Sequence, residues 1–358
     1  MAAFSRRAFL GSSAAAAAVL AKPPRYLGPP VRAAVRLSAN ENPYGACPGA
    51  MAAMRDACPR AWRYPDEAVD EVRADIARMH GVAPEWIHVT DGSSEILKLA
   101  AGAYTGPGRR LVTADPTFES CAKHAEAAGA EVTKVPLDAS FAHDLGKMTA
   151  SDAGLVYVCN PNNPTASITP AARMRDFLRA PQAMVLVDEA YHHYVDSPQY
   201  ESVAPLVKMQ PRLIVGRTFS KIYGLAGARL GYAIAQPEVI EKLASQAAFD
   251  TVNIFAAAAG RASLADAAWA AEGKRRNAAT RANVVSELQR RGFTVIPSQA
   301  NFIMFDTRKP VKPLIAALKE RGVEVGRLFP ALPTHLRVTI GRPDDMERFL
   351  SAFAAVVA

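Results

Sequence analysis

Seven short apolar runs, each set off from the next by amphipathic or turn-rich segments, constrain the fold of this chain most. Several of the runs are apolar on successive residues and not on alternate ones, which is typical of strands buried on both faces. Because amphipathic helical stretches interleave with the runs, the pattern predicts an α/β fold with a mainly parallel sheet covered by helices. The expected strands are 86–90, 111–114, 131–135, 155–159, 184–187, 213–216 and 230–235, and the expected helices between them are 69–80, 94–104, 119–128, 170–179 and 237–248.

Beyond about residue 250 the pattern changes. A helix at 271–291 is expected there, followed by strands at 293–296, 302–305 and 335–340 and helices at 312–321 and 344–356. This segment predicts a smaller α+β domain. The expected organisation is a leader at 1–21, an N-terminal arm at 22–61 that packs on the small domain or on a second subunit, a large domain at 62–248 and a small domain at 249–358.

The leader has the features of an export signal. Arg6 and Arg7 precede Phe9 and Leu10, and a short small-residue apolar stretch runs to Ala21. This order resembles a twin-arginine signal, the type that exports folded, cofactor-loaded proteins. The stretch is too short for a stable membrane span. We expect a periplasmic protein, or a cytoplasmic one if the leader is not functional.

The distribution of charge and the spacing of the cysteines exclude some other classes of protein. The formal net charge is +8, but the basic residues are spread along the chain without a nucleic-acid-binding module, so no nucleic-acid partner is expected. The four cysteines show neither a CxxC pair nor metal-ligand spacing, so we expect no metal site and no structural disulfide. Cys159 ends an apolar run and is expected to be a buried thiol.

The most specific motif surrounds Lys221 in residues 217–232, RTFSKIYGLAGARLGY. A lysine that acts as a nucleophile must be partly desolvated and close to other cations, and Arg229 is such a cation. This stretch resembles the lysine motif of fold-type I pyridoxal 5'-phosphate (PLP) aminotransferases, particularly the histidinol-phosphate aminotransferase group. The resemblance covers roughly residues 37–350 and implies the PLP-dependent transferase fold type I, with Lys221 as the residue that carries the cofactor.

Two further motifs match the same family in the same order. Asp188 ends the strand in VLVDEAY, and the resemblance pairs its carboxylate with the pyridine nitrogen of PLP. Tyr191, three residues later, and Asn163, in NPNNPT, are implied to bind the cofactor's 3'-oxygen. Taken alone, Asp188 is equally a strand-end residue that caps the next helix, and Asn-Pro is a turn signal.

The phosphate of PLP is expected at the start of a helix, where backbone N–H groups and the helix dipole favour an anion. The segment 90–95, TDGSSE, offers such a start, and Phe118 in DPTF stands where the family stacks an aromatic ring on the cofactor. Tyr64, in RYPD, matches a tyrosine that reaches the cofactor phosphate of the neighbouring subunit, which implies a homodimer. The expected phosphate ligands of the same subunit are Gly92, Ser93, Ser94, Thr218, Ser220 and Arg229.

The substrates are expected to be an amino acid and a 2-oxo acid. Arg337, in LRVTIG, resembles the arginine that grips the α-carboxylate with its planar fork. Asn301, Tyr44 and Asn42 match family positions that line the substrate pocket.

The chain departs from the family at two places. Histidinol-phosphate aminotransferases typically carry an arginine for the substrate phosphate after the strand at 322–325, whereas this chain has Gly326 there and Arg327 one place later. A one-residue shift along a strand turns a side chain to the other face, so we expect Arg327 to face away from the substrate. The sequence therefore leaves a phosphorylated substrate unassigned, and cytoplasmic histidine biosynthesis fits poorly with export. Ala166 replaces the usual glycine after NPNNPT.

The resemblance implies reversible transfer of an α-amino group, with Lys221 as general base and acid, Asp188 stabilising the electron sink and Arg337 fixing the carboxylate. Two alternatives stay open. The first is a PLP-dependent lyase or decarboxylase on the same fold, because cofactor residues do not decide which bond breaks. The second is a non-enzymatic PLP sensor, which usually carries a DNA-binding module that this chain does not show.

Overall fold

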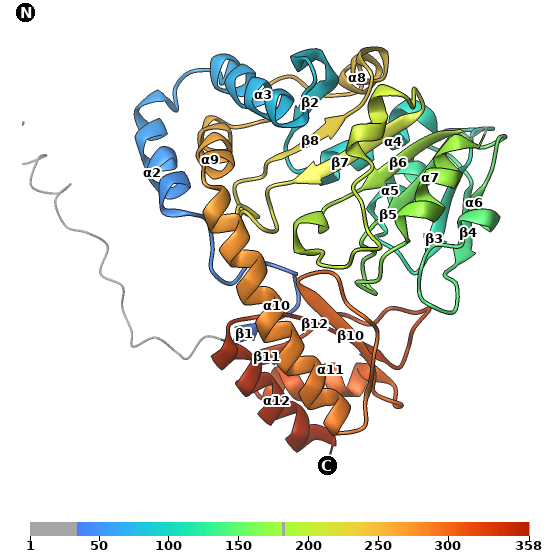
Figure 1. Ribbon diagram of the computed structural model, residues 1–358, viewed down its shortest axis with the longest axis vertical. Coiled ribbons are helices and arrows are strands. Elements are labelled where there is room, and N and C mark those ends of the chain that lie inside the picture. Colours follow the sequence, from blue (N-terminus) through green and yellow to red (C-terminus); the bar gives the residue numbers. More distant parts are fainter. Residues whose placement is uncertain (1–33, 181–182, 358) are drawn as a thin grey trace, which may run out of the picture. The chain divides into compact units, whose positions relative to one another are not determined.

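The computed structural model describes residues 34–180 and 183–357, and in this part of the chain seven strands form one sheet. The strand order is β2-β8-β7-β6-β5-β3-β4, and β8 alone runs antiparallel to its neighbours (Figure 1). This sheet confirms the predicted α/β fold. The strands are β2 (Ile87–Thr90), β3 (Leu111–Asp115), β4 (Val132–Pro136), β5 (Leu155–Cys159), β6 (Met184–Asp188), β7 (Leu213–Thr218) and β8 (Gly231–Ile234).

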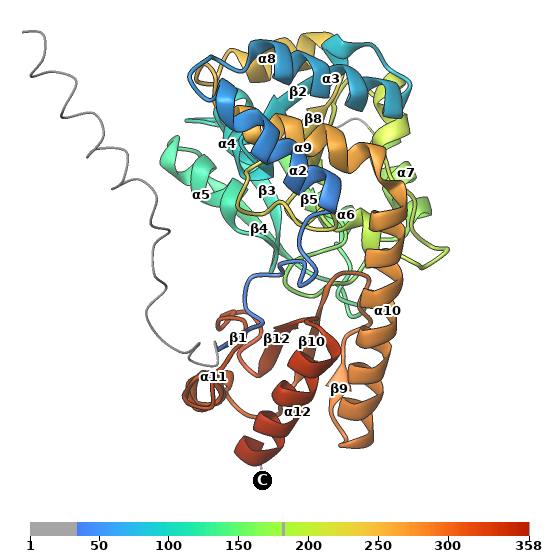
Figure 2. The same ribbon diagram turned by 90° about the vertical axis from the view of Figure 1, so that its left-hand side faces the viewer.

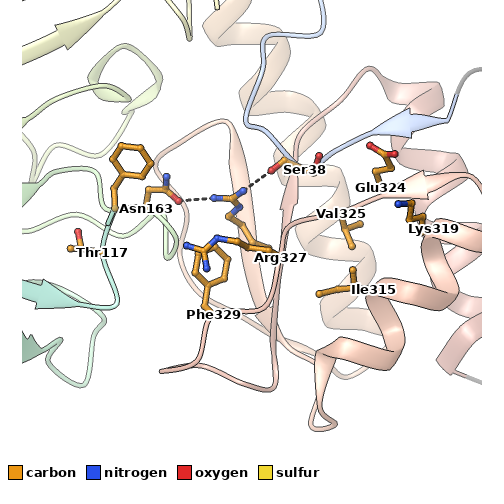
Figure 3. Close-up of a pocket in the computed structure, with 11 residues that line it drawn as sticks. Ser38, Thr117, Asn163, Ile315, Lys319, Glu324, Val325, Arg327 and Phe329 are labelled. Atoms are coloured by element: carbon orange, nitrogen blue, oxygen red, sulfur yellow. Dashed lines mark hydrogen bonds between the residues drawn. The ribbon is translucent and has the colours of Figure 1, made fainter. Parts of the chain in front are cut away.

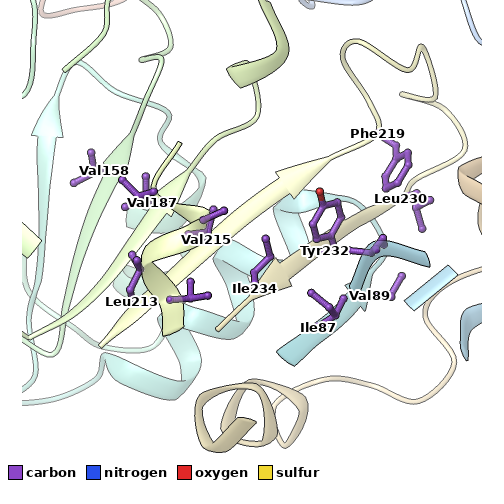
Figure 4. Close-up of a cluster of buried hydrophobic side chains, with 14 of the residues drawn as sticks. Ile87, Val89, Val158, Val187, Leu213, Val215, Phe219, Leu230, Tyr232 and Ile234 are labelled. Carbon is purple, nitrogen blue, oxygen red and sulfur yellow. The ribbon is translucent and has the colours of Figure 1, made fainter. Parts of the chain in front are cut away.

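Both faces of this sheet are covered, which explains the continuous apolar runs. In β5, Val156 and Val158 belong to one buried cluster, whereas Leu155 and Tyr157 belong to another on the opposite face. Figure 4 shows side chains of the first cluster from adjacent strands lying side by side. Helices α3 (Asp66–His80), α6 (Leu145–Met148), α7 (Ala171–Arg179) and α9 (Ile254–Ala265) pack on this first cluster, and α4 (Ser93–Tyr104), α5 (Ser120–Ala127) and α8 (Pro237–Ala244) pack on the second.

The C-terminal part of the chain forms a smaller α+β unit around its own core, as predicted. Strand β10 (Phe302–Asp306) pairs antiparallel with β9 (Thr294–Val295) and β12 (His335–Thr339). Helix α10 (Ala267–Arg290) runs from α9 beside the large sheet to β9 in the small one (Figures 1 and 2). The remaining elements are α11 (Val311–Glu320), α12 (Pro343–Val357) and a parallel pair of β1 (Val35–Arg36) with β11 (Val323–Glu324). Through β1, the described end of the N-terminal arm is tied to this unit.

Two helices, α2 and α9, and the single turn α6 were not predicted. Helix α2 (Pro48–Ala57) lies in the segment expected to be an arm, and it packs against α9. Both helices are rich in alanine, and residues of both belong to the core of the large sheet. The domain boundary predicted at residue 248 stays a prediction, because the chain from Val35 onward forms one compact unit. Short 3-10 turns lie at η1 (Cys58–Arg60), η2 (Pro84–Trp86), η3 (His192–Tyr194) and η4 (Ala204–Lys208).

Some predictions concern residues near the N-terminus that the structure does not describe. The twin-arginine leader at 1–21 and the first twelve residues of the arm, 22–33, lie outside the described residues. No helix among those described has the length and apolar character needed to cross a bilayer. The four cysteines are free thiols, and Cys159 is buried as predicted.

His143 is buried and the other histidines are partly buried, which predicts sensitivity to acid. Burial lowers the pKa of His80, His88 and His143 to about 4, that of His193 to about 3, and that of His192 well below its usual value. These imidazoles are neutral in the folded protein and take up protons on unfolding below pH 6.5. Each extra proton bound by the unfolded chain lowers stability by about 1.4 kcal/mol per pH unit. We therefore expect the free energy of unfolding to be maintained above pH 6.5 and to fall steeply between pH 6.5 and pH 4.

Thermal unfolding of the apoprotein at pH 7.5, 6.5, 5.5 and 4.5 checks this expectation. His143→Asn is the diagnostic variant, because His143 is fully buried and its Nδ1 lies 3.1 Å from Thr169 Oγ1. This variant should lose less stability per pH unit than the parent chain over the same range. Equal slopes for the two proteins would show that protonation of the buried histidines does not govern the acid transition.

Candidate active site

The predicted cofactor residues come together at the carboxyl ends of the parallel strands. Asp188 ends β6, Lys221 follows β7, Asn163 follows β5 and Phe118 follows β3. Because these strands are neighbours in the sheet, the segments that leave them meet around one cavity of about 290 Å³. The predicted residues that line it are Ser93, Ser94, Phe118, Asn163, Asp188, Tyr191, Thr218, Ser220, Lys221, Arg229 and Arg337.

Lys221 is placed to act as a neutral amine. Its Nζ lies 3.3 Å from Ala39 O and 3.1 Å from Asn40 O, and no carboxylate forms an ion pair with it among the described residues. Burial, followed by the positive charge of Arg337, lowers the pKa of the amine to about 8. About a tenth of the lysine is therefore unprotonated and nucleophilic at pH 7, far more than at the ordinary pKa of a lysine.

Asp188 is a buried carboxylate with one donor on each oxygen. Ala190 N donates to Oδ1 at 3.0 Å, and the phenolic O–H of Tyr157 donates to Oδ2 at 3.1 Å. Burial raises the pKa of Asp188 to about 6, although both donors and Lys221 act to lower it. A buried negative charge is costly unless a cationic group pairs with it, so the cavity favours a cation beside Asp188. The sequence analysis missed Tyr157, although a tyrosine inside a buried apolar strand signals a hydroxyl that needs a partner.

Tyr191 presents a hydroxyl proton to the cavity. Its oxygen accepts Asn40 Nδ2 at 3.1 Å and, more weakly, Asn163 Nδ2 at 3.4 Å. A phenol oxygen that accepts two hydrogen bonds keeps its own proton free to donate. Burial raises the pKa of Tyr191, so the group stays protonated.

The start of α4 forms an anion cradle with the lysine loop. Gly92 precedes the helix at φ +76°, and a Cβ atom placed there would lie 2.2 Å from Arg229 Nη2. The missing side chain therefore allows the guanidinium to approach the first turn of the helix. Hydroxyls of Thr218 and Ser220 line the same cavity, and Ser220 N donates to Thr218 Oγ1 at 3.1 Å.

A second cavity of about 510 Å³ adjoins the first and shares Phe118, Asn163 and Arg337 with it. Figure 3 shows Arg327 and Phe329 lining this second cavity, together with Thr117 and Ser38. The expectation that Arg327 faces away from the substrate was wrong. Strand β11 ends at Glu324, so the alternation of faces does not extend to residue 327.

Arg337 is held in place by both terminal nitrogens of its guanidinium. Its Nη1 donates to Asn163 Oδ1 at 2.7 Å and its Nη2 donates to Ser38 O at 2.6 Å, whereas the buried Nε has no partner among the described residues. A Cβ atom at Gly326 would stand 3.2 Å from that Nε. Glycine at this position therefore lets the backbone at residue 326, whose N donates to Arg337 O at 2.9 Å, pack closely against Arg337.

Five predicted site residues do not line the cofactor cavity. Asn301 donates its side-chain amide to Asn40 O, Asn42 donates to Ile222 O, and the ring of Tyr44 lies under Arg276 and Arg342. These three residues support the segment 39–44 that faces Lys221. Gly92 acts through its backbone, and Tyr64 is 78% exposed. The ligand contacts predicted for these five residues stay predictions.

The departure at Ala166 leaves the backbone of the asparagine motif in place. Ala166 adopts φ +59°, its N donates to Asn162 O and its O accepts Gln299 N. The alanine therefore occupies the left-handed conformation in which a glycine is favoured, at a cost of about 1 kcal/mol.

The residues present fit the PLP that the resemblance implies. The cradle at α4 suits a phosphate, Lys221 offers an amine for the aldehyde, and the buried carboxylate of Asp188 suits a protonated ring nitrogen. Tyr191 suits a phenolic oxygen. The cavity therefore provides a chemical partner for each polar group of the cofactor.

Comparisons with known proteins agree with this fit of the cavity to PLP. The profile of the family "Aminotransferase class I and II" matches residues 32–353. The histidinol-phosphate aminotransferase of Symbiobacterium thermophilum is 39% identical over 329 residues, which cover 90% of each chain. That of Moorella thermoacetica is 37% identical over 336 residues, which cover 92% of this chain and 86% of the relative. The crystal structure of histidinol-phosphate aminotransferase from Sinorhizobium meliloti in complex with pyridoxal-5'-phosphate superposes with a TM-score of 0.83 and 26% identity, covering 90% of both chains.

Proposed function

Because this chain belongs to the class I and II aminotransferases and is a PLP-dependent aminotransferase, we propose that histidinol phosphate is its amino donor and a 2-oxo acid its acceptor. The proposal extends to this chain the activity named for its relatives. Family membership also favours transamination over the lyase, decarboxylase and sensor alternatives.

A pair of guanidinium groups carries the proposal. Arg327 and Arg337 line the same cavity and both lie over the ring of Phe329, with their Cζ atoms 4.4 and 5.3 Å from its centroid. One guanidinium matches one carboxylate, whereas two match the double charge of a phosphate monoester. Histidinol phosphate carries its phosphate near the carbon that holds the amino group, so one end of the substrate reaches both arginines.

A donor screen tests this proposal. The enzyme is assayed with histidinol phosphate, histidinol, histidine and other amino acids, against 2-oxoglutarate and pyruvate. We expect kcat/KM for histidinol phosphate to exceed that for histidinol by at least about a hundredfold, since two charge-assisted contacts are lost without the phosphate. Equal kcat/KM values for these two donors would reject the phosphorylated substrate.

The residues around the cavity are assigned complementary roles. PLP, when bound, supplies the electron sink for the bond that breaks at the substrate α-carbon. Lys221 Nζ would take the proton from that carbon and deliver it to the cofactor's C4', and it would move a proton in the opposite direction in the second half-reaction. Arg337 fixes the anionic end of each substrate, and Phe118 covers the cavity beside it.

Tyr157 is assigned a supporting role through Asp188. In Tyr157→Phe the carboxylate loses the donor on Oδ2 but keeps Ala190 N. A hydrogen bond to a charged group contributes about 1.5–3 kcal/mol, so we expect the Kd for PLP to rise about tenfold or more. Fluorescence titration of the apoprotein with PLP measures this constant without relying on turnover.

Tyr232→Phe is the matched control for Tyr157→Phe. Tyr232 is also buried in the large sheet, but its hydroxyl lies 3.2 Å from His80 Nε2 and not beside Asp188. The control should bind PLP like the parent enzyme. Similar losses in both variants would mean that Tyr157 acts only through general packing.

A homodimer is the proposed assembly. Large apolar or aromatic side chains are exposed along one segment, with Trp62 at 76% and Tyr64 at 78%, and Phe249 is exposed at 97%. Pro65 and Asp250, the chain neighbours of Tyr64 and Phe249, line one hollow, and large apolar side chains exposed around one site are typical of an interface. Light scattering on the eluting protein measures the mass directly. In Tyr64→Ala the Kd for PLP should rise if this tyrosine serves the partner's site, and a monomeric parent protein would reject the assignment.

Export to the periplasm is proposed on the resemblance of residues 1–21 to a twin-arginine signal. Replacing Arg6 and Arg7 by lysine should leave the enzyme in the cytoplasm, and unchanged periplasmic activity would reject that signal. Export would separate the enzyme from cytoplasmic histidine biosynthesis, so the result also bears on the donor that it meets in the cell.

A further inference from the structure

Arg327 already has a carboxylate partner at the edge of the substrate cavity. Its Nη2 lies 2.8 Å from Oε2 of Glu119, and this side chain follows directly on Phe118 at the start of α5. Glu119 follows β3 and Arg327 follows β11, and both of these segments contribute residues to the cavity, Phe118 from the first and Arg327 from the second. The ion pair therefore joins two segments that border the cavity.

The charge of this pair matters because an aminotransferase binds two different substrates in turn. On the proposed function, the donor presents a phosphate dianion to Arg337 and Arg327, whereas a simple oxo acid presents one carboxylate to Arg337. With the carboxylate bound to Arg337, an unpaired Arg327 would leave a second positive charge near Arg337 without an anion to balance it. Glu119 supplies the missing negative charge.

The ion pair between Glu119 and Arg327 is also weak enough for a substrate anion to take the place of Glu119. The two side chains keep 54% and 42% of their surface exposed, and ion pairs at that exposure contribute little to stability. A phosphate dianion offers Arg327 more charge and more acceptor oxygens than one carboxylate does. Partial burial raises the pKa of Glu119, but Arg327 and Lys123 together lower it, so the group is ionised at neutral pH.

We propose that Glu119 is a specificity-determining residue, an exchangeable counter-ion that neutralises Arg327 when the bound substrate carries one carboxylate and gives way when it carries a phosphate. This inference rests on the proposed function for its substrate, since it requires Arg327 to meet a phosphate in the donor half-reaction. Glu119 is therefore expected to weaken the binding of dianions and to leave the binding of monoanions unchanged.

Glu119→Gln in the holoenzyme tests the proposal, and Glu126→Gln is its control. Glu126 lies on the same helix, is exposed, and loses the same charge without an ion pair to Arg327. With any accepted donor, we expect Glu119→Gln to lower the inhibition constant of inorganic phosphate about fivefold and to leave that of acetate within twofold. Its KM for histidinol phosphate should fall in parallel, while Glu126→Gln behaves like the parent enzyme.

The same substitution made in an Arg327→Gln variant shows whether Glu119 acts through Arg327. In Arg327→Gln, the further change Glu119→Gln should no longer alter phosphate inhibition, because the cation that the two anions share is gone. Equal changes for phosphate and acetate, no change for phosphate, or an equal effect in the Arg327→Gln background would each overturn the role of Glu119. If histidinol phosphate is not a donor but the phosphate effect appears, the substrate assignment fails and Glu119 keeps its role toward dianions.

Discussion

Lys221→Ala is expected to lower kcat by at least about a thousandfold and to abolish covalent attachment of the cofactor. Alanine removes both the amine that reacts with the aldehyde of PLP and the base that moves the α-proton. No other lysine among the described residues lines the cofactor cavity. No neighbouring side chain is therefore placed to take over either task.

The physical basis of this prediction is the state of the amine. Lys221 is held beside the carbonyls of Ala39 and Asn40, and burial brings its pKa down to about 8. A lysine with its ordinary pKa would be almost fully protonated at neutral pH and would lack the lone pair that nucleophilic attack requires. The expected loss therefore concerns chemistry and not the fold.

Borohydride reduction followed by peptide mass mapping checks the attachment, and steady-state kinetics checks kcat. Lys274→Ala is the matched control, because Lys274 is also partly buried and donates to a main-chain carbonyl, that of Val195, at 2.6 Å. The control should keep reducible cofactor on residue 221. A yellow, active Lys221→Ala protein would overturn the assignment of the cofactor residue.

The strands of the large sheet were predictable because burial on both faces leaves a direct mark in the sequence. The run 155–159 is apolar at every position and forms β5 with all five side chains buried. Helices α2 and α9 lacked such a mark. Residues 254–265 are rich in alanine and buried on several sides, so they show no apolar stripe at helical spacing. The two-residue pairing of β1 with β11 depends on contacts between distant segments, which no local pattern indicates.

The active site likewise contains residues that the sequence could place and residues that it could not. Residues at the ends of adjacent parallel strands were expected to meet, and Asp188, Asn163 and Lys221 line one cavity. Arg327 was misplaced because the strand rule was applied beyond the end of a two-residue strand. The ion pair between Arg327 and Glu119 joins residues that are far apart in the sequence, and its existence depends on the fold around the cavity.

Asp188→Asn is expected to lower kcat by about a hundredfold to ten-thousandfold while leaving the fold intact. Asparagine has nearly the same shape, and its carbonyl oxygen still accepts a hydrogen bond from Ala190 N or from Tyr157. What it lacks is the negative charge that keeps the pyridine nitrogen of PLP protonated, and an unprotonated ring accepts electrons poorly. The Kd for PLP should rise together with the loss of kcat.

The same substitution should stabilise the apoprotein, which separates a functional role from a structural one. Burial raises the pKa of Asp188 from 3.8 to about 6, so this carboxyl stabilises the fold fully only below pH 3.8, and that contribution is lost as the pH rises through 6. At pH 7.5 the apoprotein therefore holds a buried charge without its partner, and asparagine removes it. We expect apo Asp188→Asn to gain about 1–3 kcal/mol in the free energy of unfolding at pH 7.5 and nothing at pH 4. Urea unfolding of both apoproteins at the two pH values measures this difference. A destabilised variant at pH 7.5 would mean that Asp188 serves the fold, and the loss of activity would then say nothing about the cofactor ring.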